Sequence, residues 1–280
     1  MPALEPRLLS RQGGRKFYSS ESLSSKNIVP SSPRVTPKLP TCPNLTLSCQ
    51  LFQAPSGDLS GVPKVTEKCL SLGAQKALYI AADMASESDP DKVVDFALEK
   101  LGGLDYLVLN HIGPTPFAMW EGDMEHTRWL MKVNFFSYIQ MAWRALPSLE
   151  QSKGSLVVVS SLLAKMTNPF TLPYSSTKFA LNGFFGSLHH ELAMKKSNVS
   201  ISICTLGLID TESAMDKVRG VTKIPAYPAT EAALNIIIAG ATRQLDLYYP
   251  WFTQVVHIMK ELFPWATNYV IQNYSYNYNP

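Results

Sequence analysis

Two residues whose side chains can carry acid–base chemistry stand four positions apart in the stretch LPYSSTKFALNGFFGSLHHEL (172–192). On a helix, Tyr174 and Lys178 would lie on one face, one turn apart. A lysine ammonium near a phenol favours the phenolate and lowers the pKa of the phenol from about 10 toward neutral pH. Such a phenol can act as a general acid or base. The spacing alone is common, however, and it also fits an ordinary surface pair.

Polar residues upstream favour the catalytic interpretation. Ser161 ends an apolar strand pattern thirteen residues before Tyr174, where its hydroxyl could hydrogen-bond a substrate carbonyl oxygen and place it against the phenol. Asn134 interrupts the apolar run MKVNFFSY, either as a buried amide satisfied within the core or as part of the same site. Asn110 ends a further strand pattern, LVLN. The order and spacing of these residues together predict an acid–base site.

The elements that must position these residues alternate along the chain. Apolar stretches of strand length are followed by segments with apolar residues at helical spacing. This alternation is typical of a parallel sheet covered on both faces, so the predicted fold class is α/β, a Rossmann-like doubly wound parallel sheet. Ligands of such sheets lie beyond the carboxyl ends of the strands, where Asn110, Ser161 and Gly207 are expected. The predicted strands are 77–81, 105–110, 155–161 and 199–207, and the predicted helices are 64–73, 89–103, 121–148, 174–195 and 229–243.

Charge and cysteine content exclude several classes of function. The net charge is +3, and the excess positive charge lies in the first 60 residues. The near-neutral remainder is therefore not expected to bind nucleic acid. The four cysteines form no C-x-x-C pair and the histidines show no metal-ligand spacing, so we expect free thiols and no metal site. No run of eighteen apolar residues occurs, so no membrane-spanning helix is expected.

The chain is predicted to have three parts. Residues 1–63 are rich in Ser and Pro and are expected to form a disordered segment, except that LTLSCQLF (45–52) could pair as an edge strand. Residues 64–250 form the α/β domain. Residues 251–280 form an aromatic extension whose amphipathic stretch is either a helix packed on the domain or a contact surface for a membrane or a second copy of the chain.

Segments across 64–250 resemble the short-chain dehydrogenase/reductase family, and within it the 11β-hydroxysteroid dehydrogenase type 1 group. NHI (110–112) stands where most of the family has N-A-G, and LGLIDT (206–211) stands where most have P-G; both departures are features of that group. The resembling segments are YIAADM (79–84), GGLDYLVLNHIG (102–113), VNFFSY (133–138), GSLVVVSSL (154–162), YSSTKFALNGFFGSL (174–188), NVSISICTLGLIDTESAM (198–215) and GATR (240–243).

This resemblance implies a role for each residue of the site. Tyr174 would donate or accept the proton, and Lys178 would bind the nicotinamide ribose and lower the pKa of Tyr174. Ser161 would orient the substrate oxygen, and Asn134 would hold a water in a proton relay. The implied reaction is hydride transfer between NADP(H) and a steroid-like secondary alcohol or ketone, with NAD(H) left open as the alternative. Further cofactor contacts are implied for Asp83 and Met84 beside the adenine, for Asn110, His111 and Ile112, and for Ile209, Asp210, Thr211, Glu212 and Ser213 at the nicotinamide end.

One part of the family's cofactor site has no counterpart in the sequence. The family binds dinucleotide through a glycine-rich turn after its first strand, and this turn would lie upstream of Lys64. QGG (12–14) has neither an apolar strand before it nor a helix after it. Without the family's first two strands, 77–81 would lack a neighbour and 105–110 would become an edge, although 45–52 could replace one of them. We therefore expect the first strand–helix–strand unit to be missing or replaced.

Two hypotheses about function follow. The chain is a dehydrogenase that acts on a small, steroid-like substrate, or it is a catalytically silent family member that acts as a binding or dimerising module. The family resemblance implies a secreted protein or one in the lumen of the endoplasmic reticulum, and it allows a homodimer. The start MPALEPRLLSRQGGRKF has no apolar core of a signal peptide, which leaves the cytoplasm open.

Overall fold

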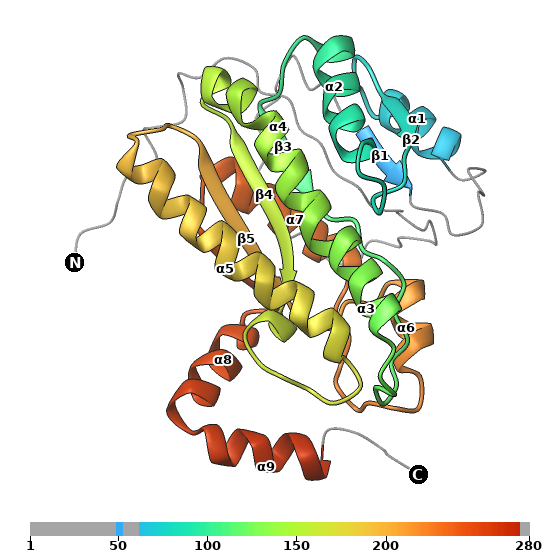
Figure 1. Cartoon of the computed structure of the whole chain (residues 1–280), viewed down its shortest axis with the longest axis vertical. Coiled ribbons are helices and arrows are strands. Elements are labelled where there is room, and N and C mark those ends of the chain that lie inside the picture. The colour runs from blue at the N-terminus through green and yellow to red at the C-terminus, as the bar shows by residue number, and fades with distance from the viewer. Residues whose placement is uncertain (1–48, 53–61, 275–280) are drawn as a thin grey trace, which may run out of the picture.

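The structure, a computed structural model, describes residues 49–52 and 62–274 (Figure 1). The predicted disorder of residues 1–63 concerns a segment that lies almost entirely outside the described residues. In the described part of the chain, a four-stranded parallel sheet forms the centre, and two further strands, β1 and β2, pair with each other. The predicted α/β fold class is confirmed.

The four-stranded sheet has the strand order β3-β4-β5-β6, and each neighbouring pair is parallel. β4 (SLVVVSS) has a continuous apolar centre, because a strand covered on both faces has no solvent side. β5 (SISICTL) is buried in its centre although polar and apolar residues alternate along it. The sequence patterns therefore predicted β4 and β5 closely. The short strand β6 (DLYY) was not predicted, since it begins with an acid and spans only four residues. The strands are β3 Tyr106–Leu109, β4 Ser155–Ser161, β5 Ser200–Leu206 and β6 Asp246–Tyr249.

Helices cover both faces of this sheet (Figure 1). α4 (Ser137–Ser152) and α5 (Leu172–Met194) lie on one face, and α7 (Ala229–Thr242) lies on the other. Because successive side chains of a strand point to opposite faces, Leu156 and Val158 of β4 belong to the large core cluster with α4 and α5. Val157, between them, belongs to a second cluster with Ala239 of α7 and Cys204. The sheet is therefore doubly wound.

Helix α2 (Asp89–Leu101) shows how local sequence sets the bounds of an element. Acidic residues occupy its first turn, where they complement the positive end of the helix dipole. Gly102 ends the helix with a left-handed φ of 77°, and its N–H donates to the carbonyl of Leu98. A side chain at this φ would be strained, so glycine is the residue that permits this end. The apolar face of α2 then packs into the large core cluster.

The predicted long helix 121–148 is interrupted. α3 (Met124–Met131) leads into a turn of π-helix, η1 (Lys132–Phe136), and α4 continues to Ser152. Continuous apolar periodicity cannot reveal one extra residue in a turn, so the sequence predicted a single helix. Such π-helical turns are frequent at functional sites, and Asn134 lies within this one.

The pair β1 and β2 decides one expectation from the sequence. β1 (Cys49–Phe52) runs parallel to β2 (Leu78–Ala81), with Cys49 opposite Leu78. β2 therefore has a strand neighbour, and the expectation that 45–52 could replace one strand is confirmed. In the described part of the chain β3 has β4 as its only strand neighbour, as expected. α1 (Val62–Ser71) precedes β2.

The C-terminal extension is helical as far as it is described. α8 (Phe252–Leu262) follows β6 and contacts it, and α9 (Pro264–Tyr274) turns away along the end of the molecule (Figure 1). Large apolar side chains of both helices are exposed, including Leu262 and Trp265. Among the described residues, no helix has the length and apolar character needed to cross a membrane.

Candidate active site

Tyr174 and Lys178 lie in the first turns of α5, close to the carboxyl end of β4. Pro173 stands in the first turn, where its missing N–H costs nothing because that donor has no helical acceptor. The Lys178 Nζ atom lies 5.7 Å from the centre of the Tyr174 ring. The two side chains therefore share one face of the helix, and the ammonium lies close enough to influence the phenol.

Lys178 is a buried cation held by specific contacts. Its side chain is among the largest that are fully buried, with 1% of the residue exposed. Nζ donates to the carbonyl of Val159 in β4 at 2.9 Å, and it lies 5.6 Å from the centre of the Tyr138 ring. A buried charge is costly unless polar groups compensate for it. A strand carbonyl and two aromatic faces contribute to this compensation.

Ser160 and Ser161 differ in what their side chains do. Ser160 is buried, and its Oγ donates to Oδ1 of Asn182 in α5 at 2.9 Å. Ser161 is half-buried and ends β4, and its Oγ accepts from the N–H of Leu163 at 3.1 Å. That bond caps η2 (Leu162–Ala164) and fixes the oxygen while the hydroxyl proton can still be donated. Of the two serines, Ser161 is the one whose hydroxyl can serve a ligand at the strand end.

The side chain of Asn134 is fully buried and serves the fold. Its Oδ1 accepts from the N–H of Gly113 at 2.7 Å, and its Nδ2 donates to Oγ1 of Thr177 at 3.4 Å. These bonds tie the turn after β3 to α5, next to Lys178.

His111 lies in the same buried cluster. Its Nε2 is 2.7 Å from Oγ of Ser137, and that hydroxyl donates to the carbonyl of Val133 at 2.6 Å. Since the proton of Ser137 is used, we assign the hydrogen on His111 to Nε2. Burial, and then the charge of Lys178, lower the pKa of the imidazole to about 3. His111 is therefore neutral at physiological pH.

Tyr138 completes the cluster, and the sequence did not single it out. Its hydroxyl donates to the carbonyl of His111 at 2.7 Å, and its ring centre lies 4.5 Å from the imidazole centre. The one available signal was its position four residues after Asn134 in VNFFSY, but an aromatic residue in an apolar helix usually serves the core. Asn110, which follows β3, is half-buried, and Ile112 is 46% exposed.

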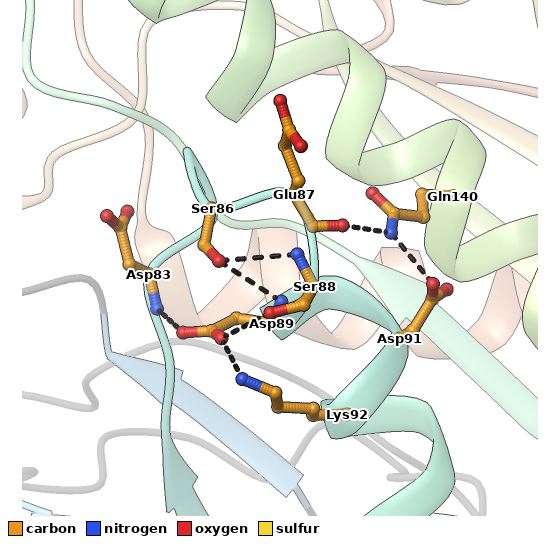
Figure 2. A network of polar contacts seen from close by, with 8 residues as sticks. All are labelled: Asp83, Ser86, Glu87, Ser88, Asp89, Asp91, Lys92 and Gln140. Carbon is orange, nitrogen blue, oxygen red and sulfur yellow. Dashed lines mark hydrogen bonds and ion pairs between the residues drawn. The ribbon is translucent and has the colours of Figure 1, made fainter.

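The turn after β2 holds Asp83, which Figure 2 shows, and Met84. The N–H of Asp83 donates to Asp89 at 3.0 Å, and its Oδ1 accepts from Ala85 at 2.8 Å; its carboxylate points away from the rest of the network in Figure 2. Lys92, bonded to Asp89 at 2.8 Å, lowers the pKa of that carboxyl to about 2. The Met84 side chain is buried in the core, so a ligand here would meet its backbone.

The segment Ile209 to Ser213 follows the carboxyl end of β5. Asp210 is fixed through both its backbone and its side chain. Its N–H donates to the carbonyl of Tyr227, and its Oδ1 accepts from the N–H of Ala229. Thr211 caps α6 (Glu212–Val218) through its hydroxyl. Glu212 and Ser213 are exposed on the first turn of α6. Most of the predicted residues thus follow the carboxyl ends of β3, β4 and β5, at the edge of the main sheet where ligands of this fold bind. Asp83 and Met84 follow β2, which pairs with β1 in a separate sheet.

The residues of the site can be compared with the two halves of a nicotinamide dinucleotide, the nicotinamide half and the phosphate half. The nicotinamide half fits, since Asn110, Ser161, Tyr174 and Lys178 supply hydrogen-bonding groups and one buried positive charge at the same sheet edge. The pyrophosphate needs a glycine-rich turn before a helix. The first glycine of the described ranges is Gly73, which follows α1 with a φ of 99°. The phosphate half therefore has no such turn within the residues that the structure describes.

Metal ligation and thiol chemistry add nothing to this site. No group of three His, Cys, Asp or Glu side chains that could hold a metal occurs among the described residues. Cys69 and Cys204 are free thiols, as expected.

Comparison with known protein families identifies the kind of protein that this chain resembles. The sequence model of the family described as short chain dehydrogenase matches residues 58–222. The hydroxysteroid 11-beta-dehydrogenase 1-like protein of Danio rerio is 64% identical over 217 residues, which is 78% of this chain and 75% of that protein. The protein of the same description from Gallus gallus is 60% identical over 216 residues, which is 77% and 74% of the two chains.

Solved structures show the same fold. A short chain dehydrogenase/reductase from Burkholderia phymatum, in complex with NAD, aligns with a TM-score of 0.64 at 17% identity, covering 77% of this chain and 85% of that one. A short chain dehydrogenase from Burkholderia cenocepacia, in complex with NADP, aligns with a TM-score of 0.63 at 20% identity, covering 81% and 86%.

Proposed function

The chain belongs to the short chain dehydrogenase family of oxidoreductases, and on this basis we propose that it transfers hydride between NADP(H) and a secondary alcohol or ketone of the hydroxysteroid type. The substrate class is supported by the description of the relatives as hydroxysteroid 11-beta-dehydrogenase 1-like proteins. NADP(H) is preferred over NAD(H) because of the resemblance to the 11β-hydroxysteroid dehydrogenase group.

One observation carries the proposal. The buried ammonium of Lys178 lies 5.7 Å from the ring centre of half-buried Tyr174, and both follow β4, whose last residue is Ser161. A phenol beside a buried cation at the ligand-binding edge of a doubly wound sheet has the environment that an acid–base catalyst needs.

The proposed mechanism assigns the proton to Tyr174. In ketone reduction its hydroxyl donates the proton to the substrate oxygen, and in alcohol oxidation its phenolate accepts that proton. Lys178 stabilises the phenolate by its charge, and the Ser161 hydroxyl donates a hydrogen bond that orients the substrate oxygen. The bound nicotinamide supplies or accepts the hydride.

The remaining residues would hold the cofactor and the proton relay. Asn134 would hold a water of the relay, and Lys178 would also bind the ribose. We propose that the cofactor lies along the carboxyl ends of the strands, in contact with Asp83 and the backbone of Met84 at its adenine end, with Asn110, His111 and Ile112 along its length, and with Ile209, Asp210, Thr211, Glu212 and Ser213 at its nicotinamide end.

A second candidate function is a catalytically silent binding or dimerising module. The glycine-rich phosphate turn that is missing from the described residues favours it. Exposed aromatic residues along the outer side of the η1–α4–α5 layer, namely Phe136, Trp143, Phe179 and Phe184, support a homodimer in either case. The exposed apolar side chains of α8 and α9 support contact with a membrane surface, as expected for a protein of the endoplasmic reticulum.

A cofactor titration separates the two functions. The purified chain is unfolded thermally at rising NADPH or NADH concentration, and a ligand at 100 times its Kd stabilises by about 2.7 kcal/mol. Stabilisation by NADPH, together with oxidation of a hydroxysteroid by NADP+ or reduction of a ketosteroid by NADPH, supports the enzyme. Tyr174→Phe should then abolish turnover and keep the thermal shift. Absence of any shift at millimolar NADPH, in a protein that unfolds cooperatively, would refute the enzyme and leave the binding module.

A further inference from the structure

Tyr138 of α4 touches two parts of the candidate site at once. Its side chain is fully buried, its ring centre lies 5.6 Å from the Lys178 ammonium, and its hydroxyl donates to the carbonyl of His111 at 2.7 Å. Lys178 is the cation that acts on Tyr174, and His111 belongs to the turn that would line the cofactor. One side chain therefore joins the acid–base pair to the cofactor turn.

The electrostatics of the cluster give the Tyr138 ring a specific task. The face of an aromatic ring carries negative charge density and attracts a cation within about 6 Å, more strongly when water is excluded. The Lys178 ammonium has nearly equal distances to the Tyr138 and Tyr174 rings, 5.6 and 5.7 Å. The attraction of the Tyr138 ring therefore favours the charged form of Lys178 and helps to keep the ammonium beside the phenol of Tyr174.

Other groups around Lys178 act differently from the ring. Val159 of β4 contributes a backbone carbonyl, at 2.9 Å. His111, from the turn after β3, is neutral, because burial and then the charge of Lys178 lower the pKa of its imidazole. Tyr174 lies on α5 itself and is the phenol on which the ammonium acts. The Tyr138 ring thus approaches the ammonium from α4, whereas Tyr174 and Lys178 both lie on α5. The position of the Tyr138 ring is therefore set by a different helix.

We propose that Tyr138 is a positioning residue for the acid–base pair: its ring holds the Lys178 ammonium beside Tyr174, and its hydroxyl fixes the His111 carbonyl and with it the turn that would line the cofactor. This inference rests on the proposed function. It predicts that the ring and the hydroxyl of Tyr138 have separate effects, one on the titration of Tyr174 and one on cofactor binding. A residue that only fills the core would not show this separation.

The first test measures the ring's effect without cofactor or substrate. The tyrosinate absorbance of the protein is titrated with pH, and the contribution of Tyr174 is taken as the difference from Tyr174→Phe in each background. Tyr138→Leu removes the aromatic face, so the ammonium is less favoured and the titration of Tyr174 should move up by about one pH unit. Tyr138→Phe keeps the face and should leave that titration unchanged. Tyr106→Leu, at a buried tyrosine of β3, is the control for lost packing.

The second test measures the hydroxyl's effect. With NADP+ and cortisol as the probes, Tyr138→Phe should raise the KM for NADP+ about fivefold, the loss expected for one hydrogen bond, and should keep the pH profile of kcat. Tyr138→Leu should raise that KM and also shift the pH profile upward.

The outcomes distinguish this inference from the proposed function. An unshifted Tyr174 titration in a folded Tyr138→Leu protein would overturn the positioning role, even if the enzyme is active. If that variant does not fold, Tyr138→Met, whose longer and more flexible side chain adapts better to the vacated space, replaces it with the same expectation. A wild-type chain that shows no turnover refutes the proposed function, while the titration still decides what Tyr138 does.

Discussion

The neutral state of His111 makes the stability of the folded chain sensitive to acid. The imidazole is buried, with 7% of the residue exposed, and its pKa is lowered to about 3 by burial and by the charge of Lys178. In the unfolded chain a histidine has a pKa of about 6.5. Between these two values the unfolded chain binds a proton that the folded chain does not bind. The stability that neutral His111 allows is therefore fully present when the pH is above the pKa of the unfolded chain. It is lost progressively as the pH falls below that pKa.

The size of this effect follows from the two pKa values. Each pH unit within that window costs about 1.4 kcal/mol, so the folded state loses about 2 kcal/mol between neutral pH and a pH of about 5. That is a large fraction of the total stability of a domain, which is usually about 5–15 kcal/mol. The pKa of Asp89 is lowered from 3.8 to about 2. The stability that this carboxylate contributes is therefore lost only at a lower pH, outside the range of the measurement.

Urea unfolding of the purified chain at a series of pH values tests this argument. His111→Asn keeps a polar group beside Ser137 but cannot take up a proton. Between neutral pH and a pH of about 5, the variant should therefore lose about 2 kcal/mol less of its free energy of unfolding than the wild type loses. His257 also has a lowered pKa, and it contributes equally to both proteins. His190→Gln, at an exposed position of α5, serves as the control and should follow the wild type. Equal acid sensitivity in the wild type and His111→Asn would refute the reasoning.

Three further predictions follow from the packing. Asn134→Leu leaves the N–H of Gly113 without its acceptor and should lower the free energy of unfolding by about 2 kcal/mol in urea; an unchanged value would show that the bond is dispensable. A Cβ on Gly240 would lie 2.7 Å from Cγ2 of Val157, so Gly240→Ala should cost about 1–3 kcal/mol and recover in part with Val157→Ala, as a double-mutant cycle measures. Burial raises the pKa of Cys204 to about 12, so the native protein and Cys204→Ala should release the same amount of dye with Ellman's reagent at a pH of about 8.

The sequence predicted those parts of the fold whose signals are local. The apolar centre of β4, the alternating pattern of β5 and the Asp-Pro start of α2 each depend on residues within one element, and the predicted bounds agree closely with the structure. The π-helical turn at Asn134 was missed because it leaves the apolar pattern unbroken. The pairing of β1 with β2 joins segments far apart in the chain, so only the structure could establish it.

The candidate site likewise contains residues that the sequence could predict and one that it could not. Tyr174, Lys178 and Ser161 could be predicted because their residue types are unusual where they stand, and the strand-end rule brings them to one edge. Tyr138 could not, since a tyrosine in an apolar helix is ordinary, and its role depends on a lysine 40 positions later in the chain approaching its ring. Which buried residues compensate a charge is decided by packing between distant segments, and residue types alone carry no sign of it.

The contacts of the acid–base groups show that this half of the site is held together by the main sheet and its helices. Lys178 is bonded to β4, and the Asn134 side chain joins the turn after β3 to α5. The ring of Tyr138 on α4 closes the same cluster. None of these contacts involves β1 or β2, so the placement of Lys178 beside Tyr174 does not depend on how the first strands of the family are replaced. The proposed binding of the cofactor phosphates would depend on it, and for that reason cofactor binding and acid–base behaviour must be measured separately in this chain.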